Sequence, residues 1–133
     1  MKLTKNFDRR EFDRHEELEP GTPLWDRMVE HLGHVQRIRD EVGAPVSISA
    51  HGGYHGPHFD EHWRRRSPGS QHRKACATDL RARGLSPKQL HAVILRLIRE
   101  GEIEQGGVGL YDGPGGYVHY DSRGTRARWR GTP

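Results

Sequence analysis

The sequence predicts an α+β fold: two main helices packed on a small, mostly antiparallel sheet, with a metal site on the sheet. Apolar residues recur at helical spacing over residues 23–42 and again over residues 87–98. Short stretches rich in β-branched and aromatic residues, bounded by Gly, Pro and Asp, follow each helix and predict strands. In a chain of 133 residues this pattern indicates a single α+β domain spanning residues 1–133.

A polar N-terminal arm over residues 1–20 opens the chain. Its isolated apolar side chains predict an irregular segment or a short helix lying on the core. The first main helix follows, because Thr22 suits an N-cap and Pro23 suits the first helical position. Gly43 supplies the left-handed conformation that commonly ends a helix. We expect the apolar stripe of this helix to form part of the core.

The second helix has a clear start and is surrounded by strand patterns. Ser86, Pro87 and Gln89 form a capping-box pattern, and Gly101 ends the helix. The strands are expected at residues 46–49, 75–80, 106–111, 117–121 and 126–130.

The composition limits the class of protein. Only 32% of the residues are hydrophobic and 17 are Gly, so the core must be small and a bound metal would help to stabilise it. A single cysteine, Cys76, excludes an internal disulfide framework. Its place in a strand predicts a small buried residue rather than a nucleophile.

The charge pattern indicates an anionic partner. The net charge is +4 and the isoelectric point is about 9.6, which suits a cell-wall polymer, a nucleic acid or a lipid headgroup. No zinc-finger spacing or single-strand stacking pattern is present, which argues against nucleic acid. No apolar run approaches the roughly 20 residues of a membrane span, and no signal-peptide pattern is visible. We therefore expect no membrane span and a cytoplasmic location at synthesis.

Two separate segments carry residues that suit a metal site. His72 and Asp79 lie in one, and His119 and Asp121 lie in the other. Two His and one Asp make a three-ligand zinc set with one position left open, which is the catalytic arrangement. Residues two apart on a strand share a face, so Tyr117 and Asp121 are expected to point the same way as His119.

These segments resemble a known peptidase family. Residues 70–79, SQHRKACATD, are similar to the S-x-H-x-x-G-x-A-x-D signature of the zinc D-Ala-D-Ala carboxypeptidase-like peptidases, which include phage L-Ala-D-Glu endopeptidases. Ala75 stands where that signature has Gly. Residues 118–129, VHYDSRGTRARW, resemble the V-H-x-D-x-R…A-R-W ending of one branch, and residues 3–12 resemble the family's start. The resemblance therefore runs nearly end to end.

The resemblance implies a hedgehog-type fold and a zinc-dependent hydrolase that cleaves D-amino-acid-containing peptides of peptidoglycan. It implies His72, Asp79 and His119 as the Zn²⁺ ligands. Ser70 is expected to hold the substrate, although a Ser there could equally cap a turn. Tyr117, on the face of His119, is expected to contact the substrate too. A small domain without a signal suits a phage lysis enzyme or a virion enzyme, with other virion proteins as partners.

The catalytic proton-transfer group has two interpretations. Other branches of the family carry an acid three residues before the last His, and Gly116 occupies that position here. Asp121 then acts as the catalytic acid and base, or it holds a ligand imidazole or pairs with Arg123. Both roles fit the spacing.

A second departure concerns the group that stabilises developing negative charge. Gly53-Tyr54-His55 stands where the family has S-G-Y-R, so His55 is expected to take over from the Arg. Residues 64–66, three consecutive Arg, are the alternative, or a solvated basic segment. Ala75, where the family's Gly supplies a bend, implies a gentler bend or a strain of about 1 kcal/mol.

These departures also support a second function. His55, Ala75 and Gly116 each replace a residue common at the family's active site. A virion or cell-wall-binding module that keeps the fold and the metal, with weakened catalysis, is therefore the alternative to the peptidase.

Overall fold

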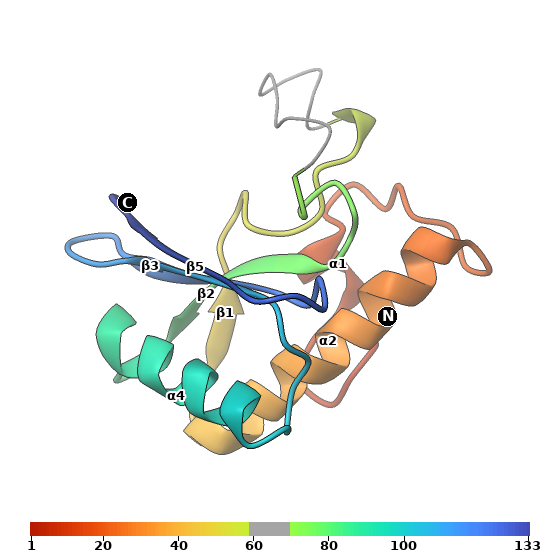
Figure 1. Cartoon of the computed structure of the whole chain (residues 1–133). Coiled ribbons are helices and arrows are strands. Elements are labelled where there is room, and N and C mark those ends of the chain that lie inside the picture. Colours follow the sequence, from red (N-terminus) through yellow and green to blue (C-terminus); the bar gives the residue numbers. More distant parts are fainter. Residues whose placement is uncertain (59–69) are drawn as a thin grey trace.

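The computed structural model describes residues 1–58 and 70–133, and it confirms the predicted α+β class. Both main helices begin and end where their caps predict: the side chain of Thr22 accepts from Trp25 N–H, and Ser86 and Gln89 form the capping box. The elements are α1 (Arg9–Phe12), α2 (Pro23–Val42), β1 (Val46–Ile48), β2 (Ala77–Ala82), α4 (Pro87–Arg99), β3 (Gly107–Tyr111), β4 (Tyr117–Asp121) and β5 (Ala127–Gly131) (Figure 1).

The five strands form one mostly antiparallel sheet with the order β1-β2-β4-β3-β5. The β1–β2, β2–β4 and β3–β4 pairs are antiparallel, whereas β5 runs parallel to β3 at the edge of the sheet. β1, β3, β4 and β5 lie within one residue of their predicted bounds. β2 is shifted by two residues, to Ala77–Ala82 from the predicted 75–80, because residues 71–75 form a turn.

The two faces of the sheet have different coverings. Helices α2 and α4 lie on one face, and the segments around residues 50–58 and 70–76 rise from the other (Figure 1). The helix-covered face contains the apolar core. Its buried members include Met28, Leu32, Val35, Leu80, Ile94, Leu97, Val108, Leu110 and Val118. Because side chains alternate along a strand, the other face is left for polar residues.

The N-terminal arm is tied to this core. It contains the short helix α1, which starts at a capping box between Asp8 and Glu11. Phe7 and Phe12 are buried in the core cluster, and the carbonyl oxygen of Phe12 accepts a hydrogen bond from Tyr54 N–H at 2.9 Å. The arm thereby helps to position the segment that leads to the polar face.

Two expectations from composition can be compared with the structure. Cys76 is buried, and burial raises the pKa of its thiol, which opposes formation of a nucleophilic thiolate. Among the described residues, no helix combines the length and apolar character that crossing a bilayer requires.

A buried histidine that sequence patterns did not single out links α2 to the sheet. His31 is fully buried, with Nδ1 at 2.8 Å from Ser122 Oγ and Nε2 at 3.1 Å from Thr78 Oγ1. Its ring stacks on Tyr120, with the centroids 5.4 Å apart. Burial lowers the pKa of His31 from 6.5 to about 3, so the ring stays neutral in the folded protein.

We predict that His31 makes the protein less stable in acid. Below about pH 6.5 the unfolded chain binds a proton on His31 that the folded chain does not bind, so the free energy of unfolding falls as the pH is lowered. His31→Gln keeps a hydrogen-bonding side chain without this titration. Urea unfolding should show a shallower pH slope for this variant, by up to about 1.4 kcal/mol per pH unit. The exposed control His15→Gln should keep the slope of the unaltered protein, and an unchanged slope in His31→Gln would contradict the prediction.

Candidate metal centre

The pairing of β2 with β4 brings two of the predicted ligands together. Asp79 lies directly opposite His119 in the antiparallel register, so both side chains project from the polar face of the sheet. Asp79 Oδ1 is 3.1 Å from His119 Nδ1. Two residues that are 40 positions apart in the chain thus meet because of strand register alone.

His72 reaches the same place from the turn before β2. Ala75 has a positive φ of 58°, so it takes the left-handed bend that the sequence pattern assigns to a Gly. The Nδ1–H group of His72 donates to the carbonyl of Gly53 at 2.9 Å, and Ser70 Oγ accepts from the backbone N–H of His72 at 3.3 Å. These bonds direct His72 Nε2 towards Asp79 Oδ1, 3.6 Å away.

The three side chains form a group that could hold a metal ion. One ligand atom from each of His72, Asp79 and His119 lies within 4.8 Å of the others, and all three residues are buried. His72 uses Nδ1 as a donor, which leaves the lone pair of Nε2 facing Asp79. The donor set of two imidazole nitrogens and one carboxylate oxygen suits zinc and several other divalent metals.

Asp121 contacts the imidazole of His119 at the nitrogen that faces away from Asp79. Its side chain is fully buried, and its Oδ2 is 2.7 Å from His119 Nε2. Arg123 donates to both carboxylate oxygens at 2.8 Å, and the backbone N–H of Gly107 donates to Oδ1 at 2.9 Å. The spacing left two roles open for Asp121. This geometry favours the role of holding the His119 imidazole over the role of transferring a proton to a substrate.

These contacts shift the pKa values of the group. Burial alone would raise the pKa values of Asp79 and Asp121, but hydrogen bonds from His119 to both, and from Arg123 to Asp121, hold both carboxyls ionised with lowered pKa values. Burial opposes the charge on His119, but its bonds to Asp121 and Asp79 outweigh burial and raise its pKa. The metal-free centre therefore favours an imidazolium held between two carboxylates.

Glycines in β3 make room for the supporting side chains. A Cβ at Gly107 would overlap the Asp121 carboxylate and Arg123, and a Cβ at Gly109 would overlap the indole of Trp129. Trp129 lies across Gly109 in the parallel β3–β5 register, and its ring is 5.0 Å from that of His119. Gly107 and Gly109 stand at every second position of the strand, and this pattern could have suggested from the sequence that other side chains lie across it.

The metal group opens into a cavity of about 230 Å³. Ser70 and Tyr117, the two predicted substrate-binding residues, both line it, as do Arg123 and Trp129. The ring of Tyr117 stacks on Tyr111 at 4.5 Å. A second cavity, of about 320 Å³, adjoins the first, and Asp79 and Tyr117 line both. Of the metal group, the first cavity is lined by all three residues and the second by Asp79.

His55, the predicted charge-stabilising residue, does not line this cavity. Its ring stacks on His72 at 4.4 Å, and its Nε2 is 2.6 Å from the carbonyl oxygen of His51. With its side chain buried against His72, it supports a ligand instead of facing a substrate. The alternative, residues 64–66, lies outside the described residues. Gly116 packs under the carbonyl oxygens of Tyr111 and Gly113 and carries no acid towards the group.

Comparison of the chain with protein-family models, with curated proteins and with solved structures finds no match. The chemistry of the centre therefore has to be argued from its own geometry.

We predict that metal binding at neutral pH releases a proton from His119. An imidazole must be deprotonated to ligate a metal, whereas the raised pKa of His119 favours its protonated form in the metal-free protein. Calorimetric titration with Zn²⁺ in buffers of different ionisation enthalpy should reveal the release, and the affinity should fall as the pH is lowered. Asp121→Asn should weaken metal binding by about 10- to 100-fold. The surface control Asp112→Asn should not, and equal affinities of the two variants would contradict the positioning role of Asp121.

A second prediction concerns the bend at Ala75. Ala75→Gly removes a left-handed strain of about 1 kcal/mol but also loses a buried methyl group worth about 0.8 kcal/mol. We expect its stability to lie within about 1 kcal/mol of the unaltered protein, with metal affinity retained. Ala75→Val puts a β-branched residue at positive φ and should lower both stability and metal affinity. Thermal unfolding with and without metal tests both variants. Unchanged stability and metal affinity in Ala75→Val would contradict the left-handed conformation at this position.

Proposed function

We propose that the protein is a zinc-dependent metallopeptidase that hydrolyses D-amino-acid-containing peptides of peptidoglycan. The observation that carries the proposal is the buried His72, Asp79 and His119 group in the wall of a cavity of about 230 Å³. Three protein ligands beside open space are typical of a catalytic metal site, because a structural site usually has four ligands. The resemblance of residues 70–79 and 118–129 to the carboxypeptidase-like signatures supports the substrate class.

His72, Asp79 and His119 would hold Zn²⁺, which would supply Lewis-acid chemistry: polarisation of a carbonyl and a lowered pKa of water, so that hydroxide is available as the nucleophile at neutral pH. The chain's own residues prepare the site. His72 is fixed by Gly53 and His119 is fixed by Asp121, so both imidazoles are oriented before a substrate arrives. Fixed ligands of this kind lower the reorganisation that the reaction requires.

Arg123 is the residue best placed to stabilise negative charge that develops on the substrate. Its guanidinium lines the cavity, while Nε and Nη2 are engaged by Asp121. Nη1 makes no hydrogen bond within residues 1–58 and 70–133, so it remains available as a donor. We therefore transfer to Arg123 the role that the sequence pattern gave to His55. Asp121 acts as a positioning residue in this proposal.

The two cavities suit an extended peptide. They share Asp79 and Tyr117 as lining residues, and in this proposal the chain of a substrate continues from one cavity to the other. Tyr111 and Tyr117 give one cavity an aromatic wall, and the hydroxyl of Ser70 lines the same cavity. Small Ala side chains and polar peptide groups fit such a lining better than large apolar groups do.

One observation favours the alternative, a virion or cell-wall-binding module that keeps the metal. Among the described residues, Asp79 is the one carboxylate that lines the 230 Å³ cavity, and the metal would occupy it. Asp121 is buried and fully engaged. A peptidase needs a group that transfers a proton to the leaving amine, so a centre without one would bind metal and substrate without turnover.

We predict that the protein releases defined peptides from purified peptidoglycan in a zinc-dependent manner. Chelation should stop the release and added Zn²⁺ should restore it, because the ligand set holds the metal that activates water. Mass spectrometry of the soluble fragments would identify the bond that is cut. His72→Ala should abolish the release, whereas the exposed control His15→Ala should retain it.

The alternative gives a different result in the same experiment. A binding module would contain stoichiometric metal and sediment with peptidoglycan but release no fragments from several wall types. His72→Ala would then lower only the melting temperature. That pattern would exclude the peptidase and leave the metal centre as a structural element.

A further inference from the structure

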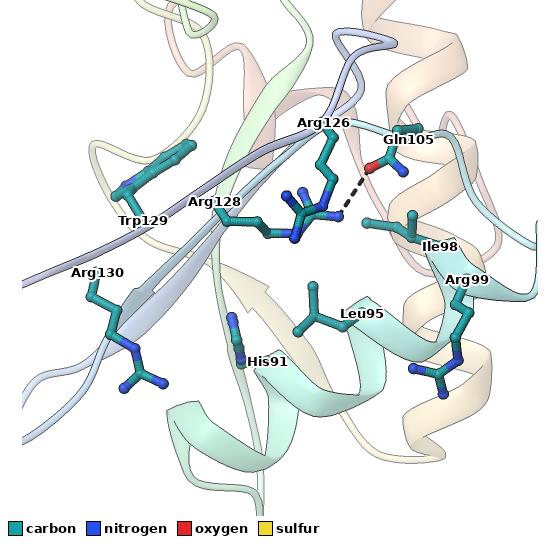
Figure 2. Close-up of a pocket in the computed structure, with 9 residues that line it drawn as sticks. All are labelled: His91, Leu95, Ile98, Arg99, Gln105, Arg126, Arg128, Trp129 and Arg130. Atoms are coloured by element: carbon teal, nitrogen blue, oxygen red, sulfur yellow. Dashed lines mark hydrogen bonds between the residues drawn. The ribbon is translucent and has the colours of Figure 1, made fainter.

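A second cavity, of about 640 Å³, lies on the opposite side of the edge strand from the metal centre. It lies between β5 and α4, as Figure 2 shows. Four arginines line it: Arg126, Arg128 and Arg130 from the β5 segment and Arg99 from the end of α4. Leu95 and Ile98 of α4 contribute apolar surface between them.

The arginines are arranged in a row by strand geometry. Residues 126, 128 and 130 alternate along an extended segment, so their side chains share one face. The Cα atoms of adjacent members of the row are about 6.6 to 6.8 Å apart along the strand. The guanidinium of Arg128 is directed to Gly106, Ala127 and Gln105, so the three charged groups lie close to one face without an even spacing. A row of this kind fits a chain with repeated negative charges better than it fits a single small ion.

The positive charge of this cavity is not neutralised by the protein. No carboxylate is among its described lining residues, and none of the four guanidiniums forms an ion pair within the described chain. Arg128 is held by neutral acceptors only, namely the carbonyls of Gly106 and Ala127 and the side chain of Gln105. By contrast, Arg96 of α4 is paired with Glu41 and Glu100.

His91, which also lines the cavity, lies in the electrostatic field of these arginines. Burial lowers the pKa of His91, and the charges of Arg130 and Arg128 lower it further. The cavity therefore opposes an additional cation and favours an anion. Arg is also the side chain whose planar fork matches phosphate oxygens in a bidentate manner.

Trp129 lies between Arg128 and Arg130 in β5, and its side chain projects from the opposite face of the strand. Trp129 points to the side of β5 opposite Arg130 in Figure 2, and its Nε1–H donates to Tyr111 Oη at 2.9 Å on the metal face. Its indole is thus engaged beside His119 rather than presented to the row of arginines. Binding of single-stranded nucleic acid usually depends on exposed aromatic rings that stack with bases. Trp129 and His91 are both among the residues that line the arginine cavity, but the Trp129 indole lies over Gly109 and is bonded to Tyr111 on the metal face, so it does not form a stacking platform in the cavity.

We propose that the arginine cavity binds a polyol-phosphate chain, a linear phosphodiester polymer without aromatic bases. The phosphates pair with the row of guanidiniums, and the carbon units between them lie on Leu95 and Ile98. This site is separate from the metal centre and does not depend on the proposed peptidase activity.

The test is a binding titration of the full chain with a short synthetic glycerol-phosphate oligomer. Arg126 and Arg130 are exposed, and within residues 1–58 and 70–133 their side chains make no ion pair or hydrogen bond, so Arg126→Gln/Arg130→Gln should fold normally. This double variant should bind the oligomer about tenfold or more weakly. The slope of log affinity against log salt should become shallower by about one to two units. The control Lys5→Gln/Arg83→Gln removes the same charge from exposed positions elsewhere and should bind nearly as the unaltered protein does.

Four results would overturn the proposal. Equal weakening in both double variants would show that only net charge matters. Tighter binding of an oligothymidylate with the same number of phosphates would assign the cavity to nucleic acid, and equal binding of an oligoglutamate would remove the preference for phosphate. Failure of all three probes to bind at low salt would exclude a polyanion site. None of these measurements involves cleavage, so they are independent of the peptidase experiment.

Discussion

Two carboxylates buried on one face of the sheet impose the main constraint on this protein. An isolated buried carboxylate costs several kcal/mol, so Asp79 and Asp121 require partners. His119 lies between them and hydrogen-bonds to both, and Arg123 completes the neutralisation of Asp121. A metal ion that joins His72, Asp79 and His119 would complete the compensation of the Asp79 charge. Removing one member of this chain of contacts would leave another buried charge without compensation.

The backbone around the centre is shaped to permit these contacts. Gly107 and Gly109 leave one side of β3 without side chains, so Asp121, Arg123 and Trp129 can lie across it. A Gly in a strand interior is usually destabilising by roughly 0.5–1 kcal/mol relative to Ala, so two of them so close together require a compensating gain. Here the gain is the neutralised carboxylate and the aromatic wall beside His119. The bend at Ala75 is a similar case, because a φ of 58° is what turns His72 back towards β2.

Much of this arrangement could be predicted from sequence, for identifiable reasons. Caps and periodicity depend on local chemistry, so α2 and α4 were predicted with their bounds, and alternation predicted β4. Other features depend on what the chain brings together. The engagement of Asp121 by Arg123 and Gly107, the burial of His55 against His72, and the network of His31 with Thr78 all rest on tertiary contacts that no spacing encodes. The parallel pairing of β5 with β3 is likewise a consequence of where the chain returns.

The edge strand explains how one short segment can serve two faces. Charged residues on an edge strand commonly prevent pairing with another chain, and this alone could account for arginines in β5. Edge protection, however, requires only charge exposed to solvent, for which Lys would suffice. In β5 the arginines instead face α4 across an apolar floor, and Arg128 is anchored by carbonyl groups without losing its charge. The alternating Trp129 completes the wall of the metal centre. This division of β5 into an aromatic face and a cationic face is better explained by two sites than by protection of an edge.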